Sequence, residues 1–147
     1  MSLLDKLTED MKAAMRAKEK ERLTTIRGLL SEVKRIEIDT KKSMTEDDEI
    51  AFLSSQAKRR REAIDAFAET RPELAQKERD ELEIIEEYLP KQLSPEEASE
   101  IVRAIIEKVG ATSKKDLGRV MGQAMGQLKG RFPGGEVKAL AEGLLPD

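Results

Sequence analysis

The side chains available for chemistry in this chain are few in kind. Its 147 residues contain no histidine and no cysteine, which excludes an imidazole general base, a thiol nucleophile and a metal site of the Cys/His type. Carboxylates are abundant, but no pair of them is set apart by its spacing as an acid/base couple or a metal cage. Examples are Glu78, Glu81, Glu86 and Glu87. We expect most of the carboxylates to be surface acids, and we expect no catalytic residue, no metal and no cofactor.

The most unusual spacing belongs to glycine. Four glycines recur at intervals of four residues: Gly118, Gly122, Gly126 and Gly130. A glycine inside a helix costs about 1 kcal/mol relative to alanine, and a four-residue interval places all of them on one helix face. Two interpretations are open. Either this face packs tightly against a neighbouring helix, or it lets a sugar-phosphate backbone approach closely, with Arg119, Lys129 and Arg131 neutralising phosphates. The charged residues in the segment argue against small-residue packing inside a membrane.

Charge is distributed unevenly along the chain, although the formal net charge is only −3. Residues 12–42 contain ten Lys/Arg against five Asp/Glu, whereas residues 62–87 contain ten acids against three bases. Residues 112–131 contain one acid, Asp116, and five bases: Lys114, Lys115, Arg119, Lys129 and Arg131. Such blocks form either solvated helix faces or a basic surface that meets a polyanion. One tyrosine and three phenylalanines leave few rings for stacking on bases.

Two further segments have a structural interpretation beside a functional one. The run Lys58-Arg59-Arg60-Arg61 covers a full helical turn, so its side chains fan around the helix. A solvated or interdomain ion-pairing role is favoured there over contact with nucleic acid. The segment 130–135, Gly-Arg-Phe-Pro-Gly-Gly, lacks the preceding strand and the Gly-Lys-Ser/Thr ending of a phosphate-binding P-loop. An interhelical turn is favoured over an anion site at the start of the next helix.

Hydrophobic periodicity predicts that all of these residues lie on or between helices. Apolar residues recur at intervals of three and four along the chain, and no segment alternates with period two. Cap pairs at Ser2, Thr45, Ser94 and Ser113 mark helix starts, and Gly110 marks a helix end. The sequence therefore predicts an all-α protein with about seven helices and no strands.

The same signals predict how the chain is divided. Pro90 and the Ser94-Pro95 helix start enclose a short connection. We therefore expect an N-terminal domain of long helices over residues 1–92 and a small C-terminal three-helix bundle over residues 93–147. Acid and base follow Met1 too soon for a signal peptide, and no apolar window is long enough to cross a membrane. Together with the lack of cysteine for disulfides, this favours a soluble, cytoplasmic protein with no membrane partner.

Several segments in order form a recognisable pattern, which includes Tyr88-Leu89-Pro90-Lys91-Gln92-Leu93; its most specific part is the stretch that ends in Tyr88-Leu89-Pro90. The others are residues 27–37, 58–62, 71–75, 78–81, 121–122 and 129–131. This pattern resembles the YqeY family, whose C-terminal domain is similar to the tail of GatB, the B subunit of the glutamine-dependent tRNA amidotransferase. The resemblance implies two all-helical domains and a tail-like domain that contacts tRNA, with the amidation chemistry in other domains and subunits. Where the family continues Gly-Arg-Ala-Asp-Gly, this chain has Gly-Arg-Phe-Pro-Gly and so loses an acid.

We therefore favour a non-catalytic helical module that binds tRNA or another structured RNA. Its predicted contact residues lie in the C-terminal domain: Lys114, Lys115, Arg119, Gly122, Gly126, Lys129 and Arg131. One alternative is an adaptor that docks on a protein assembly for aminoacylation or amidation. Another is the carbon–nitrogen ligase activity with glutamine as amido donor that the resemblance implies, for which the residues of this chain offer no catalytic arrangement.

Overall fold

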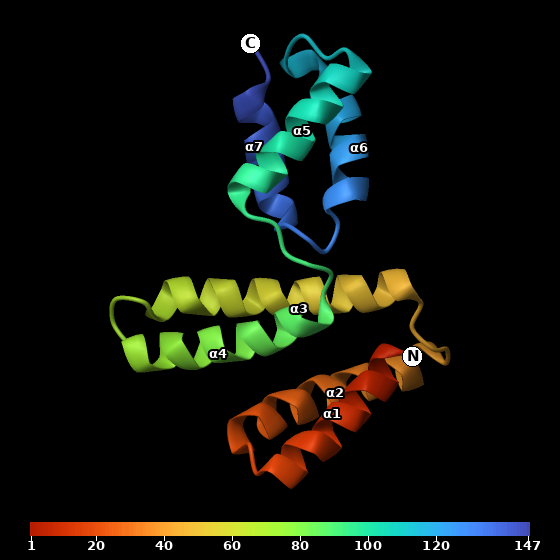
Figure 1. Cartoon of the computed structure of the whole chain (residues 1–147), viewed down its shortest axis with the longest axis vertical. Helices are drawn as coiled ribbons and strands as arrows, with labels where there is room; N and C mark the ends of the chain where they lie inside the picture. Colours follow the sequence, from red (N-terminus) through yellow and green to blue (C-terminus); the bar gives the residue numbers. More distant parts are fainter. The chain divides into compact units, whose positions relative to one another are not determined.

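The computed structural model describes every residue from Met1 to Asp147 (Figure 1). It contains seven α-helices, one short 3₁₀ helix and no strand: α1 (Leu3–Ala17), α2 (Lys20–Thr40), α3 (Glu46–Phe67), α4 (Pro72–Tyr88), α5 (Pro95–Val109), η1 (Lys114–Asp116), α6 (Leu117–Leu128) and α7 (Gly134–Leu144). This confirms the all-α prediction.

Local capping explains where most of these helices begin and end. Ser2, Thr45 and Ser94 each form a full capping box, in which the cap hydroxyl accepts from the backbone N–H three residues on and the carboxylate there accepts from the cap N–H. The pair at Ser113 forms the same box, but it opens the 3₁₀ turn η1, which leads into α6. Gly110 ends α5 in the left-handed conformation with φ of 69°. The predicted starts and this predicted end are confirmed.

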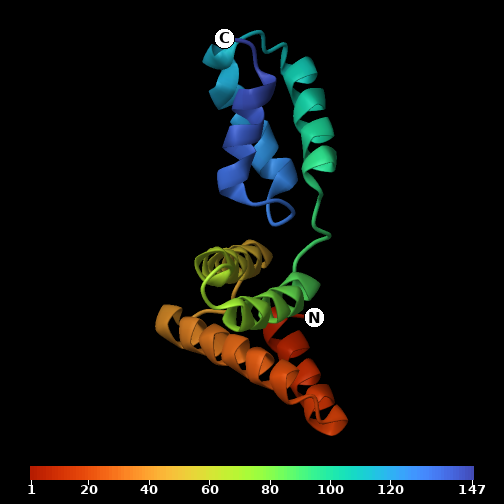
Figure 2. The same cartoon turned by 90° about the vertical axis from the view of Figure 1, so that its left-hand side faces the viewer.

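Contacts along the chain define two compact units, Met1–Tyr88 and Leu89–Asp147. In the first unit, α1 and α2 form one helical hairpin and α3 and α4 form another, and α2 packs against α4 (Figure 2). The first unit's core contains nine apolar residues that are at most 2% exposed, and the largest of them are Leu7, Ile26, Leu29, Leu53 and Ile85. These come from all four helices, so burial holds the two hairpins together.

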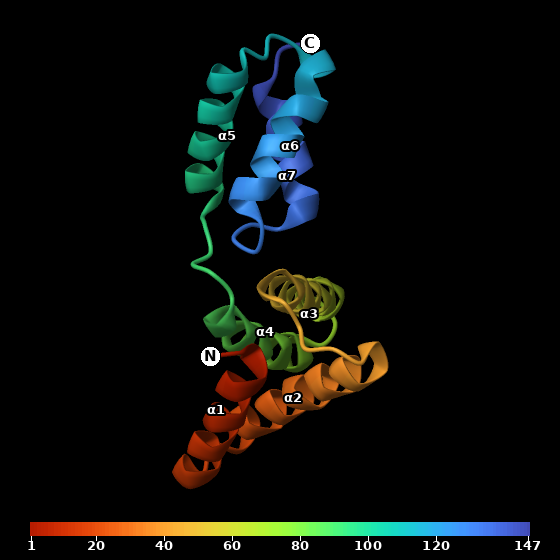
Figure 3. The ribbon, with the colours of Figure 1, turned by 90° about the vertical axis from the view of Figure 1, so that its right-hand side faces the viewer.

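The second unit is a three-helix bundle in which α5, α6 and α7 contact one another pairwise (Figure 3). Its core is built from apolar residues at helical spacing on each helix: Ala98, Val102 and Ile105 from α5, Val120, Ala124 and Leu128 from α6, and Val137 and Ala141 from α7. Phe132 of the loop between α6 and α7 joins this core and is 8% exposed.

The connection after α4 belongs to the second unit and not to the first. Gln92 Nε2 donates to the carbonyl of Gly130 at 2.6 Å, and the N–H of Leu93 donates to the carbonyl of Arg131 at 2.8 Å. These bonds explain why the second unit starts at Leu89, a few residues before the predicted boundary at residue 93. That each unit is an independently folding domain stays a prediction. None of the helices is long and apolar enough to span a membrane.

Candidate nucleic-acid interface

The orientation of α6 decides what its glycines face. Val120, Ala124 and Leu128 point into the core of the second unit and are at most 1% exposed. Gly118, Gly122 and Gly126 occupy the opposite side and are all exposed. A Cβ built on any of these three meets no other atom within 4 Å. The interpretation that this face packs against a neighbouring helix is therefore wrong within this chain.

Nothing in the fold of the second unit requires these three glycines. They lie in regular helix, and the glycines with positive φ are Gly110 and Gly130. Alanine would fit sterically at each position and would stabilise the helix by about 1 kcal/mol per site. The exposed face of α6, defined by Gly118, Gly122 and Gly126, is thus a smooth strip that is retained at a cost in stability.

The cations predicted for the site gather at the two ends of this strip. Arg119 lies in the first turn of α6, directly after Lys114 and Lys115 of η1. Lys129 and Arg131 follow the last residue of α6. The 12 residues of α6 span about 18 Å at 1.5 Å per residue. The predicted residues therefore do not form a single cluster, and the strip of glycines separates two small groups of positive charge.

Arg119 is held in place by the second unit's own groups. Its Nη2 donates to Asp116 Oδ1 at 2.8 Å, and its Nη1 donates at 3.1 Å to the carbonyl of Val109 at the end of α5. Backbone hydrogen bonding from Thr112 and the bond from Arg119 lower the pKa of Asp116 below its usual value. The Arg119 side chain is nevertheless 58% exposed. Arg119 is thus a fixed, partly neutralised charge that remains accessible to solvent.

The other cations at the start of α6 differ from one another. Lys114 Nζ forms an ion pair with Asp147, and its backbone N–H donates to Pro146, so it ties down the end of the chain. The side chain of Lys115 is exposed. Among Lys114, Lys115 and Arg119, Lys115 is therefore the cation with the fewest contacts to other groups of the protein.

At the far end of α6, the segment after Gly130 has a structural role. Gly130 takes up a φ of 73°, and Phe132 is buried in the core of the bundle. The carbonyl of Arg131 accepts from Leu93, while its Nη1 lies 3.5 Å from the carbonyl of Gln127. The interhelical turn favoured from the sequence is confirmed; Phe132 anchors it in the core, and Pro133 stands at the position of the missing acid.

The basic run in α3 is used inside the first unit. Arg60 is 20% exposed and lies between two carboxylates of α4, with its Nε 3.5 Å from Glu81 and 3.9 Å from Glu78, while its Nη1 donates to Gln56 at 2.8 Å. Arg61 pairs with Glu86 at 3.7 Å. Burial and the neighbouring Glu81 raise the pKa of Glu78. Glu78 and Glu81 are thus partly buried ion-pair partners and are exceptions to the expectation that most carboxylates are surface acids.

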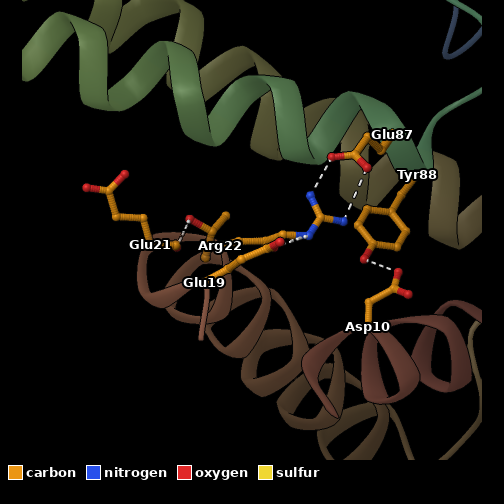
Figure 4. Close-up of polar contacts among 7 residues, drawn as sticks. Asp10, Glu19, Glu21, Arg22, Glu87 and Tyr88 are labelled. Atoms are coloured by element: carbon orange, nitrogen blue, oxygen red, sulfur yellow. Dashed lines mark hydrogen bonds and ion pairs between the residues drawn. The ribbon is translucent and has the colours of Figure 1, made fainter. Parts of the chain in front are cut away.

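A second polar cluster joins the two hairpins at the end of α4 (Figure 4). The hydroxyl of Tyr88 donates to Asp10 of α1, and Arg22 of α2 donates to both oxygens of Glu87, at 2.7 and 3.2 Å. Burial and the bond to Asp10 raise the pKa of Tyr88 well above its usual value. The sequence marked Tyr88 only as part of a family pattern, because its partner lies 78 positions away.

Comparison with known proteins assigns the family. A model described as Yqey-like protein matches residues 4–145. The chain belongs to the YqeY family. This confirms the resemblance found in the sequence, and it covers both units. No group of three or more carboxylates in this YqeY-family chain is arranged to hold a metal ion.

Curated relatives of this YqeY-family chain share one name, "Altered inheritance of mitochondria protein 41, mitochondrial". The protein from Pyrenophora tritici-repentis is 30% identical over 133 residues, which cover 88% of this chain and 72% of the relative. The proteins from Kluyveromyces lactis and Vanderwaltozyma polyspora are 41% identical over 87 residues and 36% identical over 121 residues. These matches cover 56% and 76% of this chain, but only 45% and 64% of the relatives.

The names of these relatives correct one expectation. All three are named as mitochondrial proteins, which overturns the prediction of a cytoplasmic protein. That prediction depended on the lack of a signal peptide, of a membrane-spanning window and of cysteine. Cysteine content reports on disulfides alone and does not distinguish between compartments in which disulfides are not needed.

Proposed function

We propose that this YqeY-family protein binds a folded RNA of the tRNA class through the exposed face of α6, and that it does so without catalysis. The observation that carries the proposal is the strip of Gly118, Gly122 and Gly126, which is open to solvent with no atom near the missing side chains. Cations stand at both ends of the strip, with Lys115 and Arg119 at one end and Lys129 and Arg131 at the other.

Physical chemistry explains why such a strip suits a sugar-phosphate backbone. Because glycine has no Cβ atom, a ligand can come closer to the helix axis at a glycine than at any other residue. Phosphates beyond each end of the strip then lie within reach of the cations, which supply the sequence-independent part of the affinity. Few aromatic residues are present in the chain, so recognition depends on RNA shape and phosphate contacts, with little base stacking.

The resemblance of the C-terminal unit to the tail of the amidotransferase B subunit supports the same ligand class. In that enzyme the tail contacts tRNA, and the amidation chemistry lies elsewhere. We extend only the contact to this chain. An amidotransferase activity of the chain alone would require product that depends on ATP and glutamine, and the residues named above provide no nucleophile for it.

The experiment measures tRNA binding by fluorescence anisotropy with labelled, unfractionated tRNA at low salt. The double variant G122Q/G126Q fills the strip with exposed, uncharged side chains. We expect tRNA binding to weaken by about tenfold or more, equivalent to about 1.4 kcal/mol of binding free energy. The matched control is G135Q/G143Q, because these two glycines of α7 are also exposed with open space around them. Equal affinity of the two variants would contradict the proposal.

A protein partner is the second candidate, and one observation favours it. Met125 is 41% exposed and lies beside the strip, and exposed methionines are common at protein-binding surfaces. An adaptor would dock a helix of its partner on the same glycines. This candidate is favoured if G122Q/G126Q leaves tRNA affinity unchanged and abolishes the recovery of a partner that survives nuclease treatment.

A further inference from the structure

The cations of the α1–α2 hairpin are the largest set of charges that the protein leaves without a partner. Residues 12–42 contain ten Lys/Arg. Of these, Arg22 forms ion pairs, with Glu19 and with Glu87. The other nine make no ion pair and no side-chain hydrogen bond. Elsewhere in the first unit, the arginines at positions 59–61 all face carboxylates.

Four of these nine cations form a regular row on α2. Lys20, Arg27, Lys34 and Lys41 are seven residues apart, and all four are exposed. Seven residues are close to two helical turns, or about 10.5 Å, and successive members drift by only about 20° around the axis. Lys41 is the C-cap residue directly after the last residue of α2, Thr40, so the row extends from the first residue of the helix to its end. The four charges lie along one line of about 30 Å.

Several residues between these cations are small. Thr24, Gly28 and Ser31 lie among them and are exposed, and a Cβ built on Gly28 meets nothing within 4 Å; Ile38, which is also exposed, is the exception. Arg35 adds a fifth exposed cation beside the row. Gly28 repeats on α2 what was found on α6, namely a glycine inside a helix that no packing contact requires.

The acids of α2 do not neutralise this row. Glu32 is turned towards α3, where it accepts from Gln56 at 2.9 Å and faces Arg59 at 4.0 Å. Glu37 accepts from the backbone N–H of Met44 at 2.9 Å. Glu21 and Asp39 are 18 positions, or five turns, apart, and both lie on one flank of the row. The outer face of α2 therefore carries a net positive charge along its length.

We infer that the outer face of α2, defined by Lys20, Arg27, Lys34, Arg35 and Lys41, is a binding surface for the phosphate backbone of a folded RNA. This inference goes beyond the function proposed for α6, because the outer face of α2 lies in the other unit and shares no residue with the glycine strip. Evenly spaced charges on a stiff helix fit a regularly charged polymer, and the small residues between them let that polymer approach closely.

The composition of this face distinguishes RNA from other anionic partners. A helix that lies on a membrane presents an apolar face to the lipid, but the apolar face of α2 is buried, with Ile26 and Val33 at most 1% exposed. The one large apolar side chain exposed on α2 is Ile38, at 73%. A protein interface would need a buried cluster of aromatic or other anchor residues at its centre, and this face has no aromatic residue.

The test uses the full chain and the variant K20Q/R27Q/K34Q/K41Q. The matched control is K6Q/K58Q/K77Q/R79Q, which removes four exposed cations of the same unit. Both variants therefore change the parent's net charge of −3 by the same amount. Anisotropy with labelled tRNA is measured between about 50 and 200 mM salt, over which phosphate-bound proteins lose affinity steeply. Circular dichroism verifies that both variants are folded.

We expect the row variant to bind tRNA at least about tenfold more weakly at low salt, with a log–log salt slope that is smaller by about 3, as the loss of four phosphate contacts requires. The control should bind within about twofold of the parent, since net charge alone acts only weakly across a screened surface. The charge-keeping variant K20R/K34R/K41R should retain the parent's affinity and slope.

Several results would overturn the assignment of α2. These are equal loss in the row and control variants, parental affinity of the row variant, or no tRNA binding by the parent chain. Row-dependent binding to vesicles of anionic lipid without RNA binding would assign the face to membranes instead. The two surfaces are separable, because loss of binding in the row variant with parental binding by G122Q/G126Q supports α2 and contradicts the role proposed for α6.

Discussion

In the α3–α4 hairpin, Arg60 and Arg61 meet carboxylates of the facing helix, whereas in residues 12–42 of the α1–α2 hairpin nine of ten cations meet none. Both hairpins are built from helices of similar length, although the α3–α4 hairpin is richer in acids. The difference is where the charges lie relative to the buried stripe. Arg60 lies at the margin of the α3–α4 contact, at 20% exposure, while the cations of the α2 row are exposed and have no carboxylate within ion-pair distance. Charge at a contact margin holds helices together, and exposed charge without a partner is free to meet another molecule.

The largest effect is expected from removing the central arginine of the paired hairpin. Arg60→Ala leaves Glu78 and Glu81 facing each other half-buried without their cation. We expect the free energy of unfolding, measured with urea, to fall by about 3 kcal/mol, at the lower end for breaking a buried ion pair. The control is Arg59→Ala, whose guanidinium is 63% exposed and 4.0 Å from Glu32. Arg59→Ala should lower the free energy of unfolding by less than about 0.5 kcal/mol. Equal losses in the two variants would contradict the difference between an ion pair at a helix contact and one at the surface.

A smaller effect of opposite sign is expected on the unpaired hairpin. Gly28→Ala adds a methyl group where the structure has open space, and it should raise the free energy of unfolding by about 0.5–1 kcal/mol. Thermal and urea unfolding measure the gain. In contrast, Gly110→Ala places a side chain at a φ of 69° and should destabilise the protein by about 1 kcal/mol. Destabilisation by Gly28→Ala would mean that the outer face of α2 is more crowded than the structure shows.

The smallest effect concerns the pH dependence of the paired hairpin. Burial and Glu81 raise the pKa of Glu78 in the folded state, so the folded protein holds this proton more tightly than the unfolded chain. The contribution of Glu78 to the free energy of unfolding is therefore fully present below the carboxyl pKa of the unfolded chain. It is lost as the pH rises through the raised pKa of the folded state. We expect Glu78→Gln to remove this fall, which urea unfolding at a series of mildly acidic pH values measures. A parallel pH dependence in parent and variant would contradict the raised pKa.

The charges of the second unit should respond to pH in the opposite direction. Hydrogen bonding lowers the pKa of Asp116 and of Glu97. Their contributions are therefore present above the ordinary carboxyl pKa and are lost as the pH falls through the lowered values. The Asp116→Asn variant provides the comparison, because its stability should become less sensitive to acid than that of the parent.

The parts of the fold that were predicted correctly depend on neighbours in the sequence. A capping box is complete within four residues, and an apolar stripe repeats every turn, so helix starts at Thr45 and Ser94 could be read directly. Gly110 as a helix end was predictable for the same reason. The family could also be recognised, because its pattern extends through nearly the whole chain.

The parts that were missed depend on contacts between distant segments. Arg60 meets Glu78 and Glu81 only because α3 and α4 fold back on each other, and Tyr88 reaches Asp10 across 78 positions. Spacing placed the glycines of α6 on one face, but whether that face is covered depends on where α5 and α7 lie. One signal was available, because Val120, Ala124 and Leu128 form an apolar stripe on the opposite side. The row on α2 could likewise be read as spacing, but not its lack of partners.

The cluster at the end of α4 has a mechanical consequence for α2. Two adjacent residues of one turn grip different helices, with Tyr88 holding α1 through Asp10 and Glu87 holding α2 through Arg22. Neither helix can slide along its axis without breaking a charged hydrogen bond. These two bonds therefore fix α1 and α2 against the end of α4. The positive row starting at Lys20 is thereby held at a fixed position relative to the α3–α4 hairpin. A polymer bound to it would meet charges at constant positions.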